Sequence, residues 1–320
     1  MSHRPWVSPP PLRRGDVVRV VAPSSPAPPT LVWRGLGWLA THFRLRFDRG
    51  VFARSGYHAG DDARRLDAFA SALVEPGVSA VWCVRGGVGA TRFAAKLRLE
   101  TCRDAPRWVI GFSDVTALHT ELTTERIMSV HGPHVTAVGR SDAQTRAAML
   151  DLLERPHRPR RHLHLETLVA GEARGRLVGG NLALVHDAAA ARRLRWPPGV
   201  VLFLEDVGER PYRIDRMLTS LRVGGHLDSV SGVALGDFTN CAPGPDGTTA
   251  HDVAREHFEP LGVPVVAGVP AGHGRDNQPL ILGAPCALFA PRGTGRRASL
   301  ELFPSVARAP SRDHGRGGSD

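Results

Sequence analysis

The first half of the chain alternates short apolar runs with helix-like stretches, and this alternation most restricts the fold. Runs rich in β-branched residues and bounded by turn residues occur at 16–23, 78–84 and 107–112. Residues 61–75, between the first two runs, have apolar side chains at helical spacing behind an aspartate that can cap a helix. Strand alternating with helix predicts a largely parallel α/β sheet.

The second half has more strands than helices. Apolar runs recur at residues 200–206, 231–238 and 264–270, and residues 213–221 have one apolar face and are followed by two glycines. This pattern predicts a smaller, β-rich, barrel-like domain. Residues 155–162 are charged and interrupted by proline, which is typical of a linker.

These observations predict an order of segments along the chain. We expect a flexible N-terminus at 1–14, an α/β domain at 15–152, a linker at 153–170, a β-rich domain at 171–305 and a disordered tail at 306–320.

Composition excludes several classes of protein. The net charge of +10 raises the question of nucleic acid, but the basic residues are almost all arginine and are spread along the chain without interleaved aromatics. We therefore expect no nucleic-acid partner. No apolar run reaches the length of a membrane helix and no secretion signal is visible, so we expect a cytoplasmic protein with no membrane contact. The four cysteines lack the spacing of a disulfide framework or a zinc site.

Residues 109–119, VIGFSDVTALH, end an apolar run at a serine and continue as a helix-like stretch. A nucleophilic serine needs such a strand-to-helix turn to project its oxygen beyond the sheet, and Gly111 gives the backbone room to bend. The second glycine of the G-x-S-x-G elbow is absent. Ser113 is a candidate nucleophile, and the alternative is that Ser113 or Asp114 only caps the helix.

The segment VWCVRGGVGATRF places Gly86, Gly87 and Gly89 after a predicted strand. Glycines there let backbone N–H groups approach a phosphate or a developing oxyanion. The spacing does not match a dinucleotide fingerprint, and a tight structural turn is the alternative. Arg85 is a candidate clamp for a carboxylate or, alternatively, an ordinary ion-pair partner.

Glu205 and Asp206 end the apolar run that begins at residue 200. A carboxylate in this position is desolvated unless it has a partner, and a histidine that needs orientation is one such partner. The alternative is a cluster of salt bridges with nearby arginines, which is our interpretation for Asp206, Glu209 and Asp215.

His273 lies between glycines just after the run at 264–270, on an approachable turn where an imidazole could act as a general base or be merely structural. His131 and His134 flank a Gly-Pro turn that is unsuited to holding two ligands on one helical face, and residues 162–164 fall in the linker. The sequence therefore predicts no metal site.

Together these segments resemble the LD-carboxypeptidase family, serine peptidases that remove the terminal D-alanine from murein tetrapeptides. The resemblance covers about residues 15–305 and rests on segments in one order: GDVVRVVAPSSP, RGGVGATR, GFSDVTALH, HGPH, GGNLALV, LFLEDVGERPYRIDRML and GVPAGHG. It implies an N-terminal α/β domain, a smaller C-terminal β-rich domain, a murein peptide substrate and no cofactor. Members of this family are often homodimers, so the resemblance also implies that this chain is an enzyme that forms a homodimer.

The family's roles carry over residue by residue. The resemblance implies that Ser113 is the nucleophile, His273 the base and Glu205 the acid of a catalytic triad. It also implies an oxyanion hole formed by the backbone N–H groups of Gly87 and Asp114.

Other substrate contacts follow less directly from the resemblance. Arg85 and Gly86 are candidate substrate-binding residues, with Arg85 holding the terminal carboxylate. The family segment commonly reads RGGYG, so Val88 removes an aromatic contact that the tyrosine would make. Glu209 is the alternative to Glu205 as the triad acid.

Two other functions stay open at this point. Within the same fold, a microcin-immunity-type carboxypeptidase would cleave a peptidyl or aminoacyl nucleotide. From another class, the chain could be a non-enzymatic nucleotide- or nucleic-acid-binding module that uses its glycine segment and positive charge.

Overall fold

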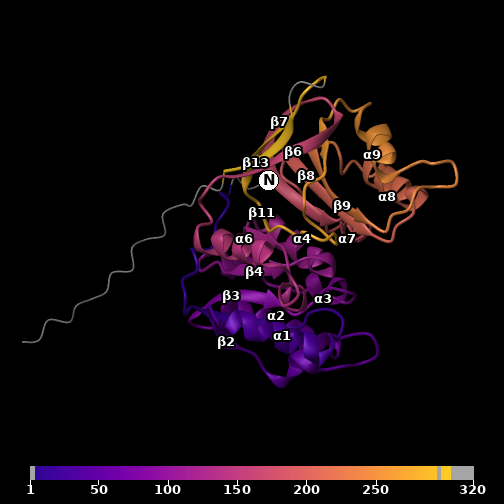
Figure 1. Ribbon diagram of the computed structural model, residues 1–320. Helices are drawn as coiled ribbons and strands as arrows, with labels where there is room; N and C mark the ends of the chain where they lie inside the picture. Colours follow the sequence, from indigo (N-terminus) through magenta and orange to yellow (C-terminus); the bar gives the residue numbers. More distant parts are fainter. Residues whose placement is uncertain (1–3, 294–296, 304–320) are drawn as a thin grey trace, which may run out of the picture.

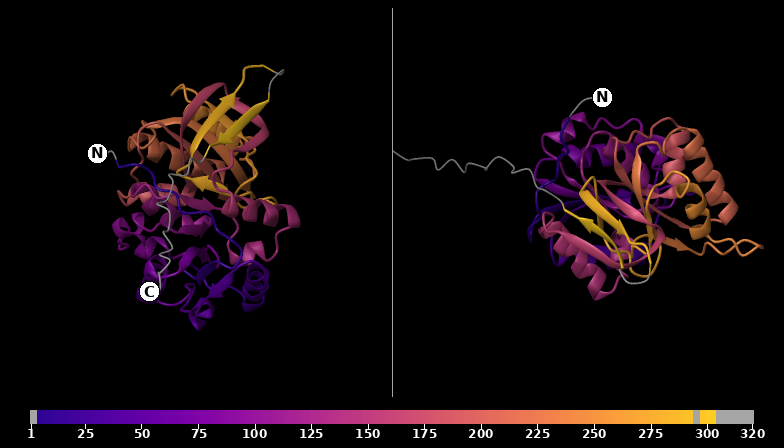
Figure 2. Two further views of the ribbon diagram at one scale, coloured as in Figure 1. Left: turned by 90° about the vertical axis from the view of Figure 1, so that its left-hand side faces the viewer. Right: turned by 90° about the horizontal axis from the view of Figure 1, so that it is seen from above.

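The computed structural model describes residues 4–293 and 297–303, which form two stacked parts (Figure 1). An α/β part, drawn in indigo to magenta, lies below a barrel drawn mostly in orange and yellow. The left view of Figure 2 shows the same stacking from another side. This architecture confirms the predicted fold class, a parallel α/β sheet joined to a β-rich, barrel-like part.

The α/β part is built on one six-stranded sheet in the order β11-β5-β4-β3-β1-β2. Its strands are β1 (Val17–Val21), β2 (Arg44–Arg46), β3 (Val78–Cys83), β4 (Trp108–Gly111), β5 (Ser129–His131) and β11 (Leu280–Leu282). Strands β1 to β5 are parallel, and β11 adds an antiparallel edge. The three apolar runs of the first half are β1, β3 and β4, as predicted.

Helices cover both faces of this sheet. They are α1 (Pro29–Ala40), α2 (Asp62–Val74), α3 (Thr91–Ala94), α4 (Thr116–Thr124), α5 (Val135–Val138) and α6 (Ala143–Glu154), with 3-10 turns η1 (Arg49–Phe52), η2 (Glu100–Arg103) and η3 (Ser113–Val115). Apolar side chains of α1, α5 and α6 share one buried cluster with the sheet. Those of α2, α3 and α4 share a second cluster, which contains the alternate residues of the same strands.

The upper part is a closed barrel in the order β10-β6-β13-β12-β7-β8-β9. Its elements are β6 (Arg160–Val169), β7 (Gly171–Asn181), α7 (Leu182–Ala190), β8 (Val200–Val207), α8 (Pro211–Val223), β9 (Val230–Thr239), α9 (Ala250–Phe258), β10 (Val265–Ala267), β12 (Pro285–Ala290) and β13 (Ala298–Leu302). Strands β7 to β10 are parallel and are connected by the three helices. Their carboxyl ends therefore lie at the same end of the barrel.

The described part of the expected flexible N-terminus is packed against the sheet, so this expectation is wrong for residues 4–14. Leu12 is buried, and the indole N–H of Trp108 donates a hydrogen bond of 2.8 Å to the carbonyl of Pro10. Apolar side chains among the prolines supply the burial that a disordered segment lacks. The expected tail at 306–320 lies outside the described residues.

The expected linker at 153–170 contains a strand. Helix α6 continues to Glu154 and β6 begins at Arg160, so only residues 155–159 connect the two parts here. The two arginines of β6 have acidic partners: Arg160 pairs with Asp151 of α6 at 3.0 Å, and the exposed Arg161 pairs with Glu301 of β13. The remaining domain boundaries stay predictions.

The chain also returns to the α/β part late in the sequence. Residues 268–279 lead from β10 of the barrel to β11, which pairs with β5 in the lower sheet. The predicted base His273 therefore lies on a connection that is anchored in both parts. Among the described residues, no helix combines the length and apolar character that crossing a membrane requires.

Candidate active site

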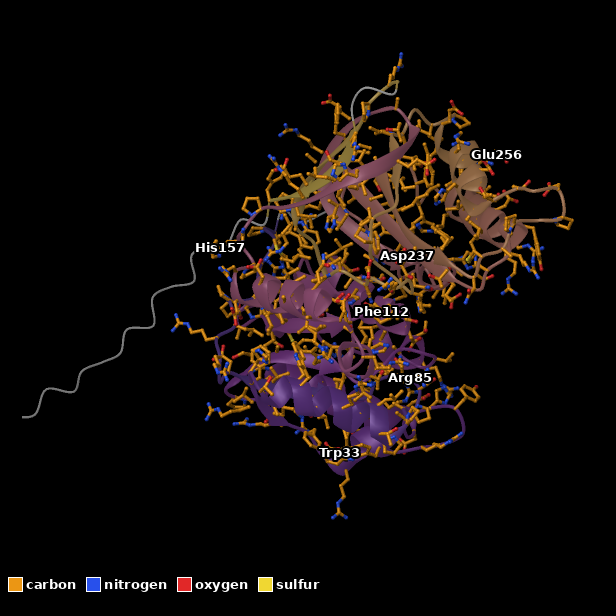
Figure 3. The ribbon with its side chains drawn as sticks, viewed as in Figure 1. Trp33, Arg85, Phe112, His157, Asp237 and Glu256 are labelled. Carbon is orange, nitrogen blue, oxygen red and sulfur yellow. The ribbon has the colours of Figure 1, made fainter. Side chains whose placement is uncertain are left out.

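The strand ends of the two parts face each other. The lower sheet has the order of a doubly wound fold, with its topological switch between β1 and β3, and ligands of such folds bind outside the carboxyl ends of the strands. The glycine segment follows β3 and Ser113 follows β4. In Figure 3, Arg85 and Phe112 lie below the junction and Asp237 lies above it.

Ser113 occupies a strained turn between β4 and α4. Its φ of 64° is in the left-handed region, which few residues with a side chain adopt. Its hydroxyl caps neither η3 nor α4, and the Asp114 carboxylate instead accepts a hydrogen bond of 2.8 Å from the Ala90 N–H. The capping alternative is therefore wrong for both residues. Ser113 is half-buried and keeps an exposed fraction.

The glycine segment lies directly against this serine. A Cβ added to Gly86 would be 2.7 Å from Cβ and 3.0 Å from Oγ of Ser113, so only glycine fits. Gly87 is exposed, has a φ of 108°, and its N–H has no acceptor among the described residues. The N–H of Asp114 lies in the first turn of η3, where backbone donors lack intrahelical acceptors. Within residues 4–293 and 297–303, neither predicted oxyanion donor therefore has a protein acceptor.

Glu205 and His273 form a pair at the end of the barrel. Nδ1 of His273 lies 2.7 Å from Oε2 of Glu205, whose side chain is fully buried. Because an ionised carboxylate only accepts hydrogen bonds, Nδ1 carries the proton and Nε2 of the neutral ring is left as a base. Among the described residues, His273 is hydrogen-bonded to Glu205, whereas Glu209 pairs with Arg213.

The two pKa values follow from this pairing. Burial by itself would raise the pKa of Glu205, but the nearby imidazole of His131 and the hydrogen bond and charge of His273 outweigh it and lower the pKa to about 2. Burial by itself would lower the pKa of His273, but the hydrogen bond and charge of Glu205 outweigh it and raise the pKa above its ordinary value. The carboxylate is ionised over the physiological range, as an orienting group should be.

The expected hydrogen bond between Ser113 and His273 is not formed in this structure. No hydrogen bond joins the two side chains among the residues that the structure describes, although the His273 ring centroid lies 4.9 Å from that of Phe112, the neighbour of Ser113. The serine comes from the lower sheet and the histidine from the connection to the barrel. Hydrogen bonds across such a junction are often long without substrate and tighten in the complex.

Side chains that sequence reasoning did not identify hold the His273 turn. The carboxamide oxygen of Asn277 accepts the Gly272 N–H at 3.1 Å, and the carboxylate of Asp237 accepts the Gly274 N–H at 3.2 Å. Asp237 ends an apolar run as Glu205 does, so the same signal in the sequence could have found it. Asn277 lies in the His273 segment itself but carries no recognisable pattern.

Arg85 follows β3 and makes no ion pair among the described residues. Its guanidinium donates a hydrogen bond of 3.1 Å to the carbonyl of Pro26, and no salt bridge involves it among the described residues. The ordinary ion-pair interpretation of Arg85 is therefore wrong. Its role as a carboxylate clamp stays a prediction.

The other acidic residues have structural partners. Glu209 pairs with Arg213 at 2.6 Å, as the salt-bridge interpretation predicts. Asp215 instead contacts His257 at 2.8 Å. Asp206 has no arginine partner: its carboxylate accepts hydrogen bonds of 3.0 Å from the side-chain amide of Asn181 and the N–H of Ala183, which corrects the salt-bridge interpretation for this residue.

The two histidines of the HGPH segment lie beside Phe112 and Glu205. His134 begins α5, where its Nδ1 accepts the Ala137 N–H at 3.1 Å, and its ring stacks on Phe112 with centroids 4.7 Å apart. His131 is fully buried, and its Nε2 lies 3.8 Å from Oε1 of Glu205. Within the described residues, no group of three or more His, Cys, Asp or Glu side chains could hold a metal ion.

Comparison with known proteins identifies the family. The LD-carboxypeptidase N-terminal domain family matches residues 18–132, and the LD-carboxypeptidase C-terminal domain family matches residues 174–288. The chain belongs to the LD-carboxypeptidase family and is a hydrolytic carboxypeptidase. This confirms the resemblance that the sequence motifs indicate.

Relatives cover almost the whole chain. A protein of Synechocystis sp., provisionally named a carboxypeptidase, is 37% identical over 92% of this chain and 99% of its own length. The murein tetrapeptide carboxypeptidase of Pseudomonas aeruginosa is 34% identical over 82% of this chain and 89% of its own length.

Solved structures share the fold. The muramoyltetrapeptide carboxypeptidase from Oxalobacter formigenes has a TM-score of 0.78 at 24% identity, covering 90% of this chain and 100% of its own. The microcin C7 self-immunity protein MccF has a TM-score of 0.81 at 20% identity, covering 94% of this chain and 100% of its own.

Gly272 provides a test of the acid–base geometry. Its φ is 128°, and an added Cβ would lie 2.7 Å from Oε2 of Glu205, the atom that accepts from His273. Gly272→Ala should therefore displace the carboxylate and lower kcat by about 100-fold, the effect of a misplacement of about 1 Å. The measurement is steady-state release of the terminal amino acid.

Gly268 is the matched control for this substitution. It lies on the same connection with a φ of 89°, but an added Cβ would meet nothing within 4 Å. Gly268→Ala should cost about 1 to 2 kcal/mol of unfolding free energy, because of its positive φ, and leave kcat unchanged. Equal activity of the two variants would show that the clearance at Glu205 does not matter.

Proposed function

We propose that this chain is a serine LD-carboxypeptidase that releases the terminal D-alanine of murein tetrapeptides through a Ser113–His273–Glu205 triad. The observation that carries the proposal is the hydrogen bond of 2.7 Å between buried Glu205 and His273, at the junction into which the strained Ser113 turn projects. In the triad arrangement, an acid that fixes the tautomer of the base leaves the second ring nitrogen available to a hydroxyl.

The proposed reaction has two stages. Ser113 attacks the carbonyl of the L-configured centre of the third residue, meso-diaminopimelate or L-lysine, while Nε2 of His273 takes its proton. The backbone N–H groups of Gly87 and Asp114 bind the developing oxyanion, each contributing about 3 to 4 kcal/mol. D-Alanine leaves with the proton from His273, and water then hydrolyses the acyl-enzyme.

Arg85 has a separate role in the proposal. Its guanidinium has no acidic partner among the described residues, so it can hold the terminal carboxylate of the peptide beside Gly86. Val88 is 53% exposed at the same segment and adds no aromatic face. The family also suggests a homodimer, and we keep the expectation that nucleic acid is not a partner.

The murein substrate is supported by the named relatives. The murein tetrapeptide carboxypeptidase of P. aeruginosa is 34% identical, whereas the microcin C7 self-immunity protein of Escherichia coli is 22% identical. Residues 206–272 contain only three aromatic side chains, Tyr212, Phe238 and Phe258, and Phe258 is fully buried. A stacking surface for a nucleobase is therefore not favoured in this stretch.

A direct assay tests the proposal. The protein is incubated with a murein tetrapeptide and, separately, with an aminoacyl nucleotide, and products are identified by mass spectrometry. We expect tripeptide and D-alanine from the first substrate, no cleavage of the second, and no effect of EDTA. Cleavage of the nucleotide conjugate alone would assign the chain to the microcin-immunity activity instead.

A further inference from the structure

His131 is a buried imidazole in an apolar cage next to the proposed triad. Its side chain has no exposed surface, and its ring lies edge-on to Phe112 and Phe203 at centroid distances of 5.9 Å and 5.0 Å. Neither ring nitrogen has a hydrogen-bond partner among the described residues. Such unpaired buried nitrogens are rare in native proteins and call for a specific explanation.

The nearest complementary atom belongs to Glu205. Oε1 of this carboxylate is also buried without a hydrogen-bond partner, and it lies 3.8 Å from Nε2 of His131. Oε2 of the same carboxylate is already bound to Nδ1 of His273. An ionised carboxylate needs a donor and the N–H of an imidazole supplies one, so the two unpaired atoms match chemically. A shift of less than 1 Å would bring them within hydrogen-bond distance.

The contact joins the two parts of the molecule. His131 ends β5 of the lower sheet, and Glu205 lies on β8 of the barrel. The backbone of His131 is also paired in register with Leu280 of β11, the strand that follows the His273 connection. The same residue therefore touches the acid through its ring and anchors the connection that carries the base.

We propose that His131 is a positioning residue, which donates its Nε2–H to Oε1 of Glu205 when the two parts close on substrate and so holds Oε2 toward His273. The inference rests on the proposed function of the triad. His131 touches neither the substrate nor Ser113 in this arrangement and acts only through Glu205. With Oε1 held, the carboxylate cannot rotate away from the imidazolium that forms during the reaction.

Two variants separate positioning from packing. His131→Phe keeps an aromatic ring between Phe112 and Phe203 but removes the donor, whereas His131→Gln restores an N–H near the Nε2 position. We expect the phenylalanine variant to lose about 10- to 100-fold in kcat with KM unchanged, as loss of a hydrogen bond to a charged group implies. The glutamine variant should recover kcat to within a few-fold of wild type.

Either of two results for the kcat values of these variants would overturn the proposal. If His131 serves only for packing, the phenylalanine variant keeps wild-type kcat, or the glutamine variant is as impaired as the phenylalanine variant. Thermal unfolding of both variants shows whether a loss of kcat instead reflects a loss of fold.

A second measurement needs neither a variant nor turnover. Imidazole ¹⁵N spectra of the wild-type protein should show the proton of His131 on Nε2, and a proton on Nδ1 would overturn the proposal. If the wild type releases no D-alanine, the proposed function fails, while the tautomer of His131 still tests whether Nε2 carries the proton that this contact requires.

Discussion

Replacing Ser113 by alanine should abolish release of D-alanine while leaving the fold and peptide binding intact. The proposed mechanism has no other nucleophile, and removal of the nucleophile in serine peptidases costs about 10⁴- to 10⁶-fold in kcat. The side chain makes no cap and no hydrogen bond to His273, so alanine removes no stabilising contact among the described residues. The measurements are D-alanine release, and calorimetry for peptide affinity.

The strained backbone at Ser113 allows a second variant that separates loss of activity from loss of stability. Glycine adopts a φ of 64° without the penalty of a side chain, so Ser113→Gly should be inactive but unfold at or above the wild-type temperature. Ser71→Ala, at an exposed position of α2, is the control and should keep full activity. Substantial turnover in Ser113→Gly would show that another group is the nucleophile.

The acyl-enzyme gives a direct readout of the same residue. A serine-reactive phosphonate should add one label to the wild-type protein, at Ser113, and none to Ser113→Ala. Labelling of the variant at a different serine would contradict the assignment.

Local signals explain why the strands of the lower sheet could be predicted. Apolar runs bounded by turn residues are set by neighbours in the sequence, and β1, β3 and β4 follow them. Local signals do not predict which sheet a strand joins, because that depends on partner strands far along the chain. Residues 280–282 are buried on all sides, and nothing local indicates that they return to pair with His131 rather than remain in the barrel.

The same distinction applies to the site. Glu205 and His273 could be predicted from carboxylate and glycine signals together with the family resemblance, but their distance could not. The sequence suggests His131 only as a possible metal ligand on a helix, whereas His131 ends a strand and faces Glu205 from the opposite part. Contacts across a junction leave no periodic pattern in either segment, which is why such residues appear only in the structure.

Glu205→Gln should produce the second-largest loss, about 10⁴-fold in kcat, by analogy with the amide replacement of the orienting acid in serine peptidases. The amide has the shape of the carboxylate but can present an N–H to Nδ1 of His273, which favours the tautomer with the proton on Nε2. Nε2 of His273 would then already carry a proton and could not accept the proton of the Ser113 hydroxyl. Peptide affinity should change little, because Glu205 is fully buried.

The pH dependence of Glu205→Gln provides an independent signature. His273 must be neutral to act as a base, so wild-type kcat/KM should fall as the pH drops through its raised pKa, above the ordinary value of 6.5. Without the charge of Glu205, burial lowers this pKa, and the acid limb of the profile moves to lower pH. Glu209→Gln, which removes only the pair with Arg213, should keep both the rate and the profile of the wild type. If Glu209→Gln instead lost activity and shifted the profile, Glu209 would be the acid of the triad.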